Sequence, residues 1–254
     1  MNVFFHTFGC RANQYDTELV RQAFSDRGVA VVNDPASADV AVVNSCTVTQ
    51  ESEAKLRQFV RRLARRPTGR PLETVVMGCA AARDDGTLRA LPSVRAVVGG
   101  ADAAAVLSAA GLATRSVDPV LRRFGSNQRG WLKIQDGCDE HCSFCATTLA
   151  RGANRSRSIA ELVEEAKQLA THHAELVITG VHIGTYGKDL ANPGRKPGVQ
   201  AQRTLERRRR CRHGIGHSRT VSGMSRMLLC PNIFWELMSV RVRGWAGSTC
   251  CSAR

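Results

Sequence analysis

Apolar and polar positions alternate along the first hundred residues in two different patterns. Continuous apolar runs predict buried strands at residues 3–10, 38–46, 73–79 and 93–100. Apolar residues recurring every three or four positions predict helices at residues 17–28, 52–66 and 101–112. Regular alternation of strands and helices predicts a parallel sheet covered by helices, and therefore an α/β fold.

A second α/β pattern follows a stretch of mixed polarity that we interpret as a linker. It predicts a strand, a helix, and a strand that ends in a glycine-rich loop, at residues 131–137, 158–173 and 175–187. Ser158 and Glu161 have the spacing of a capping box at the helix start. We interpret His172 and His173, at the helix end, as surface residues. For Trp131 and Tyr186 we favour packing over stacking on a base.

The alternating pattern stops near residue 190. Residues 191–254 carry 13 Lys and Arg against 2 Asp and Glu, whereas residues 1–190 carry 23 against 20. Four consecutive arginines at 207–210 are typical of an RNA-binding arm. Isolated tryptophans and aperiodic cysteines instead favour the product of a shifted reading frame. We therefore expect an irregular tail and no metal ligands among Cys211, Cys230, Cys250 and Cys251.

The composition predicts the cellular compartment of the chain and the role of its cysteines. No run of about 18 apolar residues occurs, which predicts no transmembrane helix, and the first residues lack the features of a secretory signal. We therefore expect a cytoplasmic protein. In that reducing compartment, ten cysteines favour metal or redox chemistry over disulfides. The net charge of +14 is typical of nucleic-acid partners, although most of it lies in the tail.

Three cysteines occupy equivalent positions in the first pattern. Cys10, Cys46 and Cys79 each follow a predicted strand and precede a predicted helix. The carboxyl ends of parallel strands meet along one edge of a sheet, where ligands bind. Buried apolar packing is the ordinary role of a single cysteine. Three at equivalent strand ends favour shared metal ligation.

A second group of cysteines has close spacing. Cys138, Cys142 and Cys145 form a C-x3-C-x2-C motif. This spacing is neither the paired C-x2-C of structural zinc sites nor the C-x2-C-x2-C of bacterial ferredoxins. Zinc completed by His141, as in a zinc-binding nucleic-acid module, remains an alternative. Three ligands leave one coordination position for something other than a protein side chain.

The motif, with Phe144 at its aromatic position, resembles that of the radical S-adenosylmethionine (SAM) enzymes. The resemblance implies a 4Fe–4S cluster held by the three cysteines, with SAM on the fourth iron. It also implies that the strand end at Thr179, Gly180 and Val181 contacts the methionine part of SAM. The cofactor would supply the radical chemistry, and the protein would position it.

The segments TFGCRANQYDTE, VVNSCTVTQESEAK, VVMGCAA and QDGCDEHCSFC followed by ARGANRSRS together resemble the methylthiotransferase family, over residues 1 to about 190. The resemblance implies a second 4Fe–4S cluster at Cys10, Cys46 and Cys79. Arg151 and Arg157 lie in a motif suited to phosphate or substrate contact, with a solvated basic loop as the alternative. Asn13 and Asn44 are placed to orient the first cysteines or to cap helices.

The resemblance is nearest to the branch that acts on threonylcarbamoyl-adenosine beside the tRNA anticodon. It implies an N-terminal parallel-sheet domain at 1–112, a linker at 113–130 and the start of a radical SAM partial (β/α) barrel at 131–190. The implied partners are tRNA, SAM, a sulfur donor and an electron donor, with no membrane or DNA. Alternatives are sister enzymes acting on isopentenyl-adenosine in tRNA or on a ribosomal-protein aspartate, and a non-enzymatic iron–sulfur fragment.

Overall fold

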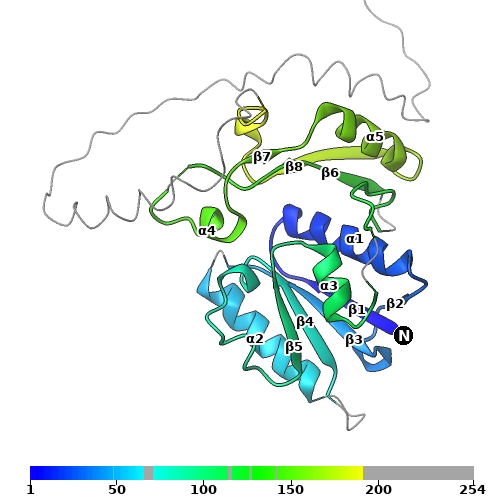
Figure 1. The fold of residues 1–254 in the computed structure, drawn as a ribbon, viewed down its shortest axis with the longest axis vertical. Coiled ribbons are helices and arrows are strands. Elements are labelled where there is room, and N and C mark those ends of the chain that lie inside the picture. The colour runs from blue at the N-terminus through cyan, green and yellow to red at the C-terminus, as the bar shows by residue number, and fades with distance from the viewer. Residues whose placement is uncertain (48, 66–70, 114–115, 126–127, 141, 191–254) are drawn as a thin grey trace, which may run out of the picture.

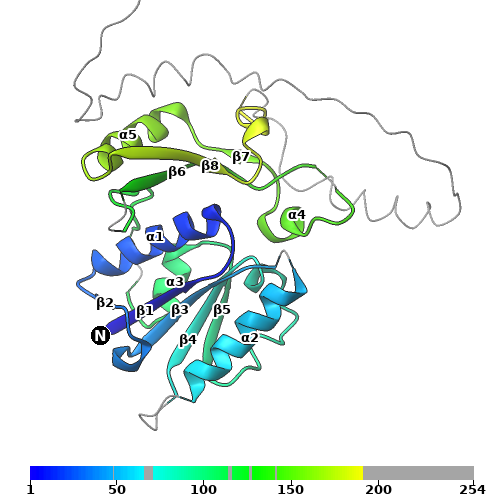
Figure 2. The same ribbon diagram turned by 180° about the vertical axis from the view of Figure 1, so that it is seen from behind.

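The computed structural model describes residues 1–190, except residues 48, 66–70, 114–115, 126–127 and 141. The zinc alternative at His141 and the predictions for residues 191–254 therefore lie outside the described residues. Within these limits the chain forms two sheets with helices packed against them (Figures 1 and 2). No helix among the described residues is long and apolar enough to cross a membrane.

The first sheet has five parallel strands in the order β2-β1-β3-β4-β5. Its strands are β1 (Asn2–Thr7), β2 (Ala30–Val32), β3 (Val40–Ser45), β4 (Glu73–Gly78) and β5 (Val94–Gly99). The central strand β3 is buried along its whole length. This explains its continuous apolar pattern, because a parallel strand covered on both faces needs apolar residues on both sides.

Helices cover both faces of this sheet. They are α1 (Arg11–Ser25), α2 (Gln50–Ala64) and α3 (Ala103–Ala109), with the short turns η1 (Pro35–Ser37) and η2 (Ala81–Arg83). Helices α1 and α3 pack on one face around Phe24 and Leu107. Helix α2 packs on the opposite face through Leu56, Val60 and Leu63. The α/β prediction for this region is confirmed.

The second sheet has three strands in the order β7-β6-β8. Its elements are β6 (Arg129–Asp136), α4 (Thr147–Arg151), β7 (Arg155–Ser156), α5 (Ile159–Ala170), β8 (Glu175–Gly180) and η3 (Ile183–Thr185). Strands β6 and β8 are parallel, and β7 is antiparallel to β6. The capping box predicted at Ser158 and Glu161 is present at the start of α5.

Helix α1 lies between the two sheets and packs on both (Figures 1 and 2). Phe24 belongs to the first core, whereas Tyr15 belongs to a core shared with β6 and α5. Leu121 and Phe124, from the predicted linker, are buried in this second core. The chain between the sheets is therefore a packed segment, and the proposed domain boundaries stay predictions.

Two interpretations of single residues change with the structure. His173 is buried, and its Nε2 accepts the backbone N–H of Phe124 at 2.9 Å, so the prediction of a surface residue is wrong. His172 is exposed, as expected. Trp131 packs against Phe124, as the packing interpretation predicts.

Candidate functional site

The first three cysteines gather at one edge of the first sheet. Cys10, Cys46 and Cys79 follow β1, β3 and β4, which are neighbouring parallel strands. The strand order reverses between β1 and β3, and in open α/β sheets the crevice at such a reversal is where ligands bind. Cys10 is exposed, whereas Cys46 and Cys79 are buried. The site is therefore open to solvent at Cys10 and closed at the other two cysteines.

Asn13, in the first turn of α1, joins two of these cysteines, Cys10 and Cys79. Its Oδ1 accepts hydrogen bonds from Cys10 Sγ at 3.6 Å and from Cys79 Sγ at 3.7 Å. Its Nδ2 donates to the carbonyl oxygen of Ser45 at 2.8 Å and to Asn44 Oδ1 at 3.2 Å. Neither asparagine caps α1, since the N-cap Cys10 makes no side-chain cap bond. The structure favours the orienting role over the capping role for both.

Gly9, which has no side chain, leaves room for Cys46 to lie near Asn13. A Cβ atom at Gly9 would lie 3.1 Å from Cys46 Sγ and 3.2 Å from Asn13 Nδ2. The φ angle of Gly9 is +103°, in the region that favours glycine. A larger residue would therefore push Cys46 away from Asn13. The three cysteines, 36 and 33 positions apart in the sequence, meet around one amide side chain.

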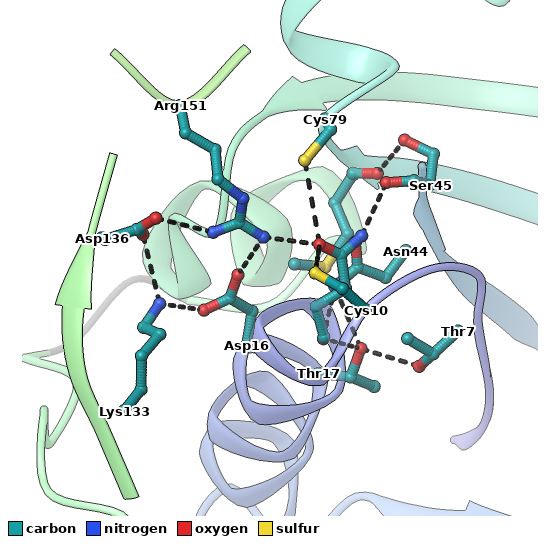
Figure 3. Close-up of polar contacts among 12 residues, drawn as sticks. Thr7, Cys10, Asp16, Thr17, Asn44, Ser45, Cys79, Lys133, Asp136 and Arg151 are labelled. Atoms are coloured by element: carbon teal, nitrogen blue, oxygen red, sulfur yellow. Dashed lines mark hydrogen bonds and ion pairs between the residues drawn. The ribbon is translucent and has the colours of Figure 1, made fainter. Parts of the chain in front are cut away.

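Arg151, at the end of α4, reaches from the second sheet into this site (Figure 3). Its Nη2 donates to Asn13 Oδ1 at 2.5 Å and to Asp16 Oδ2 at 3.0 Å, and its Nη1 donates to Asp136 Oδ1 at 2.8 Å. Lys133 Nζ joins the same two carboxylates. The exposed Arg155 also pairs with Asp136, at 3.8 Å, so three cations and two anions form a network between α1 and β6.

The network changes the acidity of its members. Burial raises the pKa of Asp136, but the charges of Lys133 and Arg151 lower it more, to about 2. For Cys79, burial raises the pKa and outweighs the opposing effect of the Arg151 charge and hydrogen bond. Arg151 itself has a raised pKa, because the carboxylates outweigh its burial. The guanidinium is therefore a permanent positive charge beside the thiols.

The second cysteine group lies in the loop after β6. Cys138 donates its backbone N–H to the carbonyl oxygen of Gly152 at 3.0 Å, which ties the start of the loop to the end of α4. Cys145 Sγ accepts the backbone N–H of Thr147 at 3.4 Å, and the Thr147 hydrogen bonds lower the pKa of this thiol. Phe144 is 90% exposed. Of the three thiols of the loop, that of Cys142 is exposed, and those of Cys138 and Cys145 are partly buried.

The end of β8 is joined to this loop through Gln135. The Gln135 side chain donates to the carbonyl oxygen of Gly137 at 2.6 Å and accepts the backbone N–H of His182 at 2.8 Å. His182 Nδ1 lies 3.6 Å from Cys138 Sγ. Thr179 and Gly180 end β8 beside Gln135. The segment expected to contact SAM and the cysteine loop therefore share one end of the second sheet.

Comparisons with known proteins agree with this arrangement. Residues 2–99 match the family described as Uncharacterized protein family UPF0004. The threonylcarbamoyladenosine tRNA methylthiotransferase MtaB of Bacillus subtilis is 35% identical over 206 residues, which cover 74% of this chain and 45% of the relative. Over the aligned part, this chain belongs to the methylthiotransferase family.

Relatives that are named for other substrates have similar sequence identity to this chain. The tRNA-2-methylthio-N(6)-dimethylallyladenosine synthase of Fervidobacterium nodosum is 31% identical, with 75% of this chain and 46% of the relative covered. The ribosomal protein uS12 methylthiotransferase RimO of Anaeromyxobacter sp. is 36% identical, with coverages of 76% and 44%. The chain spans about half the length of the curated relatives that it matches.

The chain carries suitable donors for the implied clusters. Thiolates are the usual ligands of 4Fe–4S clusters, and each group supplies three. Among the described residues, no three His, Cys, Asp or Glu side chains are already placed as they would be around a metal ion. The chemistry of the donors fits, and ligation by the six cysteines stays a prediction.

The two arginines of the motif have partners inside the protein. The Arg151 side chain is 8% exposed. Arg157 pairs with Glu165 at 2.7 Å and donates to the Tyr15 hydroxyl at 3.0 Å. The alternative of a solvated basic loop is therefore wrong for both residues. Contact with substrate stays a prediction.

The sequence interpretation did not include the carboxylates and lysine of the network, Asp16, Lys133 and Asp136. One indication was available, since Lys133 is a charged residue inside the apolar strand WLKIQ. A buried lysine requires an anionic partner. No periodicity identifies that partner, because Asp16 lies 117 positions away.

Proposed function

We propose that this chain acts as a radical SAM methylthiotransferase that adds a methylthio group to an adenine of tRNA. The observation that carries the proposal is that two separate groups of three cysteines follow strand ends in two sheets, and that Arg151, on the helix after the second group, contacts Asn13 beside the first. A single group would support a simple iron–sulfur protein. Two groups, one with the radical SAM spacing, support a reaction that needs a radical source and a sulfur site.

The protein's own residues would prepare both sites. Before a cluster binds, Asn13 would hold the thiols of Cys10 and Cys79 in place, and Gln135 would hold the cysteine loop against the end of β8. Thr179, Gly180 and Val181 would orient SAM beside Cys138, Cys142 and Cys145. A cluster held there, with SAM, would supply radical chemistry to the site. Phe144, which is exposed in the loop, would shield the cofactor.

For the substrate we propose threonylcarbamoyl-adenosine next to the tRNA anticodon, because the MtaB proteins of three organisms are 32–35% identical to this chain. Relatives named for dimethylallyladenosine and for ribosomal protein uS12 are 31% and 36% identical to this chain. Their substrates are therefore the alternatives. We also propose an electron donor and a sulfur donor as partners, and a cytoplasmic location.

Anaerobic reconstitution with iron and sulfide tests the proposal. We expect about eight irons per chain, and about four after alanine replaces either group of three cysteines. With SAM and a reductant, the chain should release 5′-deoxyadenosine, and tRNA should gain the mass of a methylthio group. A variant that lacks Cys138, Cys142 and Cys145 should release none.

The alternatives give different results in the same experiment. Cluster assembly without 5′-deoxyadenosine would support a non-enzymatic iron–sulfur fragment. Stoichiometric zinc and no iron absorbance would support a zinc module. Mass gain on ribosomal protein, or on tRNA carrying dimethylallyladenosine, would instead support the activity of the corresponding sister enzyme.

A further inference from the structure

We infer that Arg151 is a positioning residue for the first cysteine group, and that its charge raises the reduction potential of the cluster held there. The inference rests on the proposed function and goes beyond it. It gives a residue from the second sheet a role in a centre whose ligands all come from the first. The accessory centre would then be complete only when the two sheets are docked.

The geometry shows how the side chain reaches the site (Figure 3). Arg151 lies six positions after Cys145, at the end of α4, yet its guanidinium turns away from that loop toward α1. Its Nη2 shares the oxygen of Asn13 with the thiols of Cys10 and Cys79. Arg151 is therefore one hydrogen bond removed from two of the three proposed ligands.

The positions of the charges in the network predict the direction in which the reduction potential shifts. Arg151, Lys133 and the exposed Arg155 outnumber the two carboxylates of Asp16 and Asp136. Within this network only the Arg151 guanidinium contacts Asn13, whose oxygen also contacts the sulfurs of Cys10 and Cys79, so the network meets the sulfurs through a positive charge. A nearby cation stabilises the more negative, reduced state of a cluster. Charges and hydrogen bonds around the ligands are known to set cluster potentials.

The burial of the network makes the effect large enough to measure. Arg151 is 8% exposed and Asp16 is 3% exposed, so solvent screens these charges weakly. At an effective dielectric constant of about 20, a unit charge within about 6 Å changes a one-electron equilibrium by at least tenfold. Arginine does not lose its proton in proteins, so the effect is present at every working pH.

The test uses the full chain with Cys138, Cys142 and Cys145 replaced by alanine, so that only the first centre binds iron. An EPR-monitored redox titration then gives its potential. For Arg151→Met we expect the equilibrium constant for reduction to fall at least tenfold, which is 59 mV for one electron. Arg151→Lys keeps the charge and should stay within about threefold of the parent.

Two further variants separate charge from packing. Asp136→Asn removes the carboxylate that pairs with the far side of Arg151 and should shift the potential in the opposite direction. Arg122→Met removes another arginine that joins the second-sheet side of the chain to α1, through Asp26, far along the helix from the cysteines. It should leave the potential unchanged.

The outcomes distinguish this inference from the proposed function. If the parent chain binds no cluster at Cys10, Cys46 and Cys79, both are overturned. If the cluster forms and Arg151→Met leaves its potential within threefold, only the inference is overturned. If Arg151→Met cannot bind iron, the potential of Asp136→Asn decides. A positive shift supports the inference, and no shift overturns it.

Discussion

The stability that Asp136 contributes should depend on pH in a defined way. Its carboxylate accepts hydrogen bonds from Arg151 and from the backbone of Gly137, and it pairs with Lys133 at 3.2 Å. Burial opposes its ionisation, but the two cations lower its pKa from 3.8 to about 2. A depressed pKa in the folded state stabilises the fold above the unfolded pKa, and this stabilisation is lost as the pH falls toward the folded value.

The size of this contribution follows from the shift. One pKa unit corresponds to about 1.4 kcal/mol, so the shift of Asp136 corresponds to about 2 kcal/mol at pH 7. Replacing Asp136 by Asn, which resembles the protonated acid, should remove this amount at pH 7. The difference from the parent should shrink below pH 4 and fall to about 1 kcal/mol near pH 2.5.

Urea unfolding of the cluster-free chain at a series of pH values measures this difference. Asp118→Asn is a matched control, because Asp118 also pairs with an arginine, Arg122, but its side chain is 42% exposed. Exposed pairs of this kind contribute less than about 1 kcal/mol. The reasoning would be refuted by equal stabilities of parent and Asp136→Asn at pH 7, or by a difference that stays constant down to pH 2.5.

Other substitutions test the packing around the site. Gly78→Ala should lower the free energy of unfolding by more than about 2 kcal/mol, because its φ is +94° and a Cβ would lie 2.7 Å from a carbonyl oxygen of β3. Gly28→Ala has positive φ but open space, so a urea titration should show about 1 kcal/mol; equal losses would contradict this. Tyr15→Phe removes the hydroxyl that donates to buried Glu165 at 2.7 Å, which should cost about 1–2 kcal/mol; an unchanged urea midpoint would count against it. Ser158→Ala should lower the thermal midpoint through loss of about 1 kcal/mol of capping energy.

The main strands were predictable because their chemistry is local. Strands β3 and β4 are buried, and their apolar runs mark them within two residues of their bounds. The start of α1 was not predictable in this way. Its first turns bury Asn13, Asp16 and Thr17, so the buried face is polar and gives no apolar period. Strand β7 has two residues, too few for any pattern.

The convergence of Cys10, Cys46 and Cys79 was predictable because parallel strands place their carboxyl ends together. Apart from the local contact of Cys10 with Asn13, the contacts around these cysteines were not, since they join residues far apart in the chain. Arg151 and Asn13 are separated by 138 positions, and Tyr15 and Glu165 by 150. Such pairs depend on how the two sheets dock, which local sequence does not encode.

Contacts between α1 and the second-sheet side of the chain affect the cysteine site only at the N-terminal end of the helix. Asn13 and Asp16 lie one helical turn apart, and Arg151 bonds to both. If the second sheet shifts along α1, Arg151 must therefore either lose its bond to Asp16 or move the Asn13 side chain that contacts the thiols. The pair formed by Arg122 and Asp26, at the other end of the helix, has no contact with this turn. Docking and cysteine geometry are thus coupled at the N-terminal end of α1, where loosening the second sheet should disturb the first centre before it unfolds the first sheet.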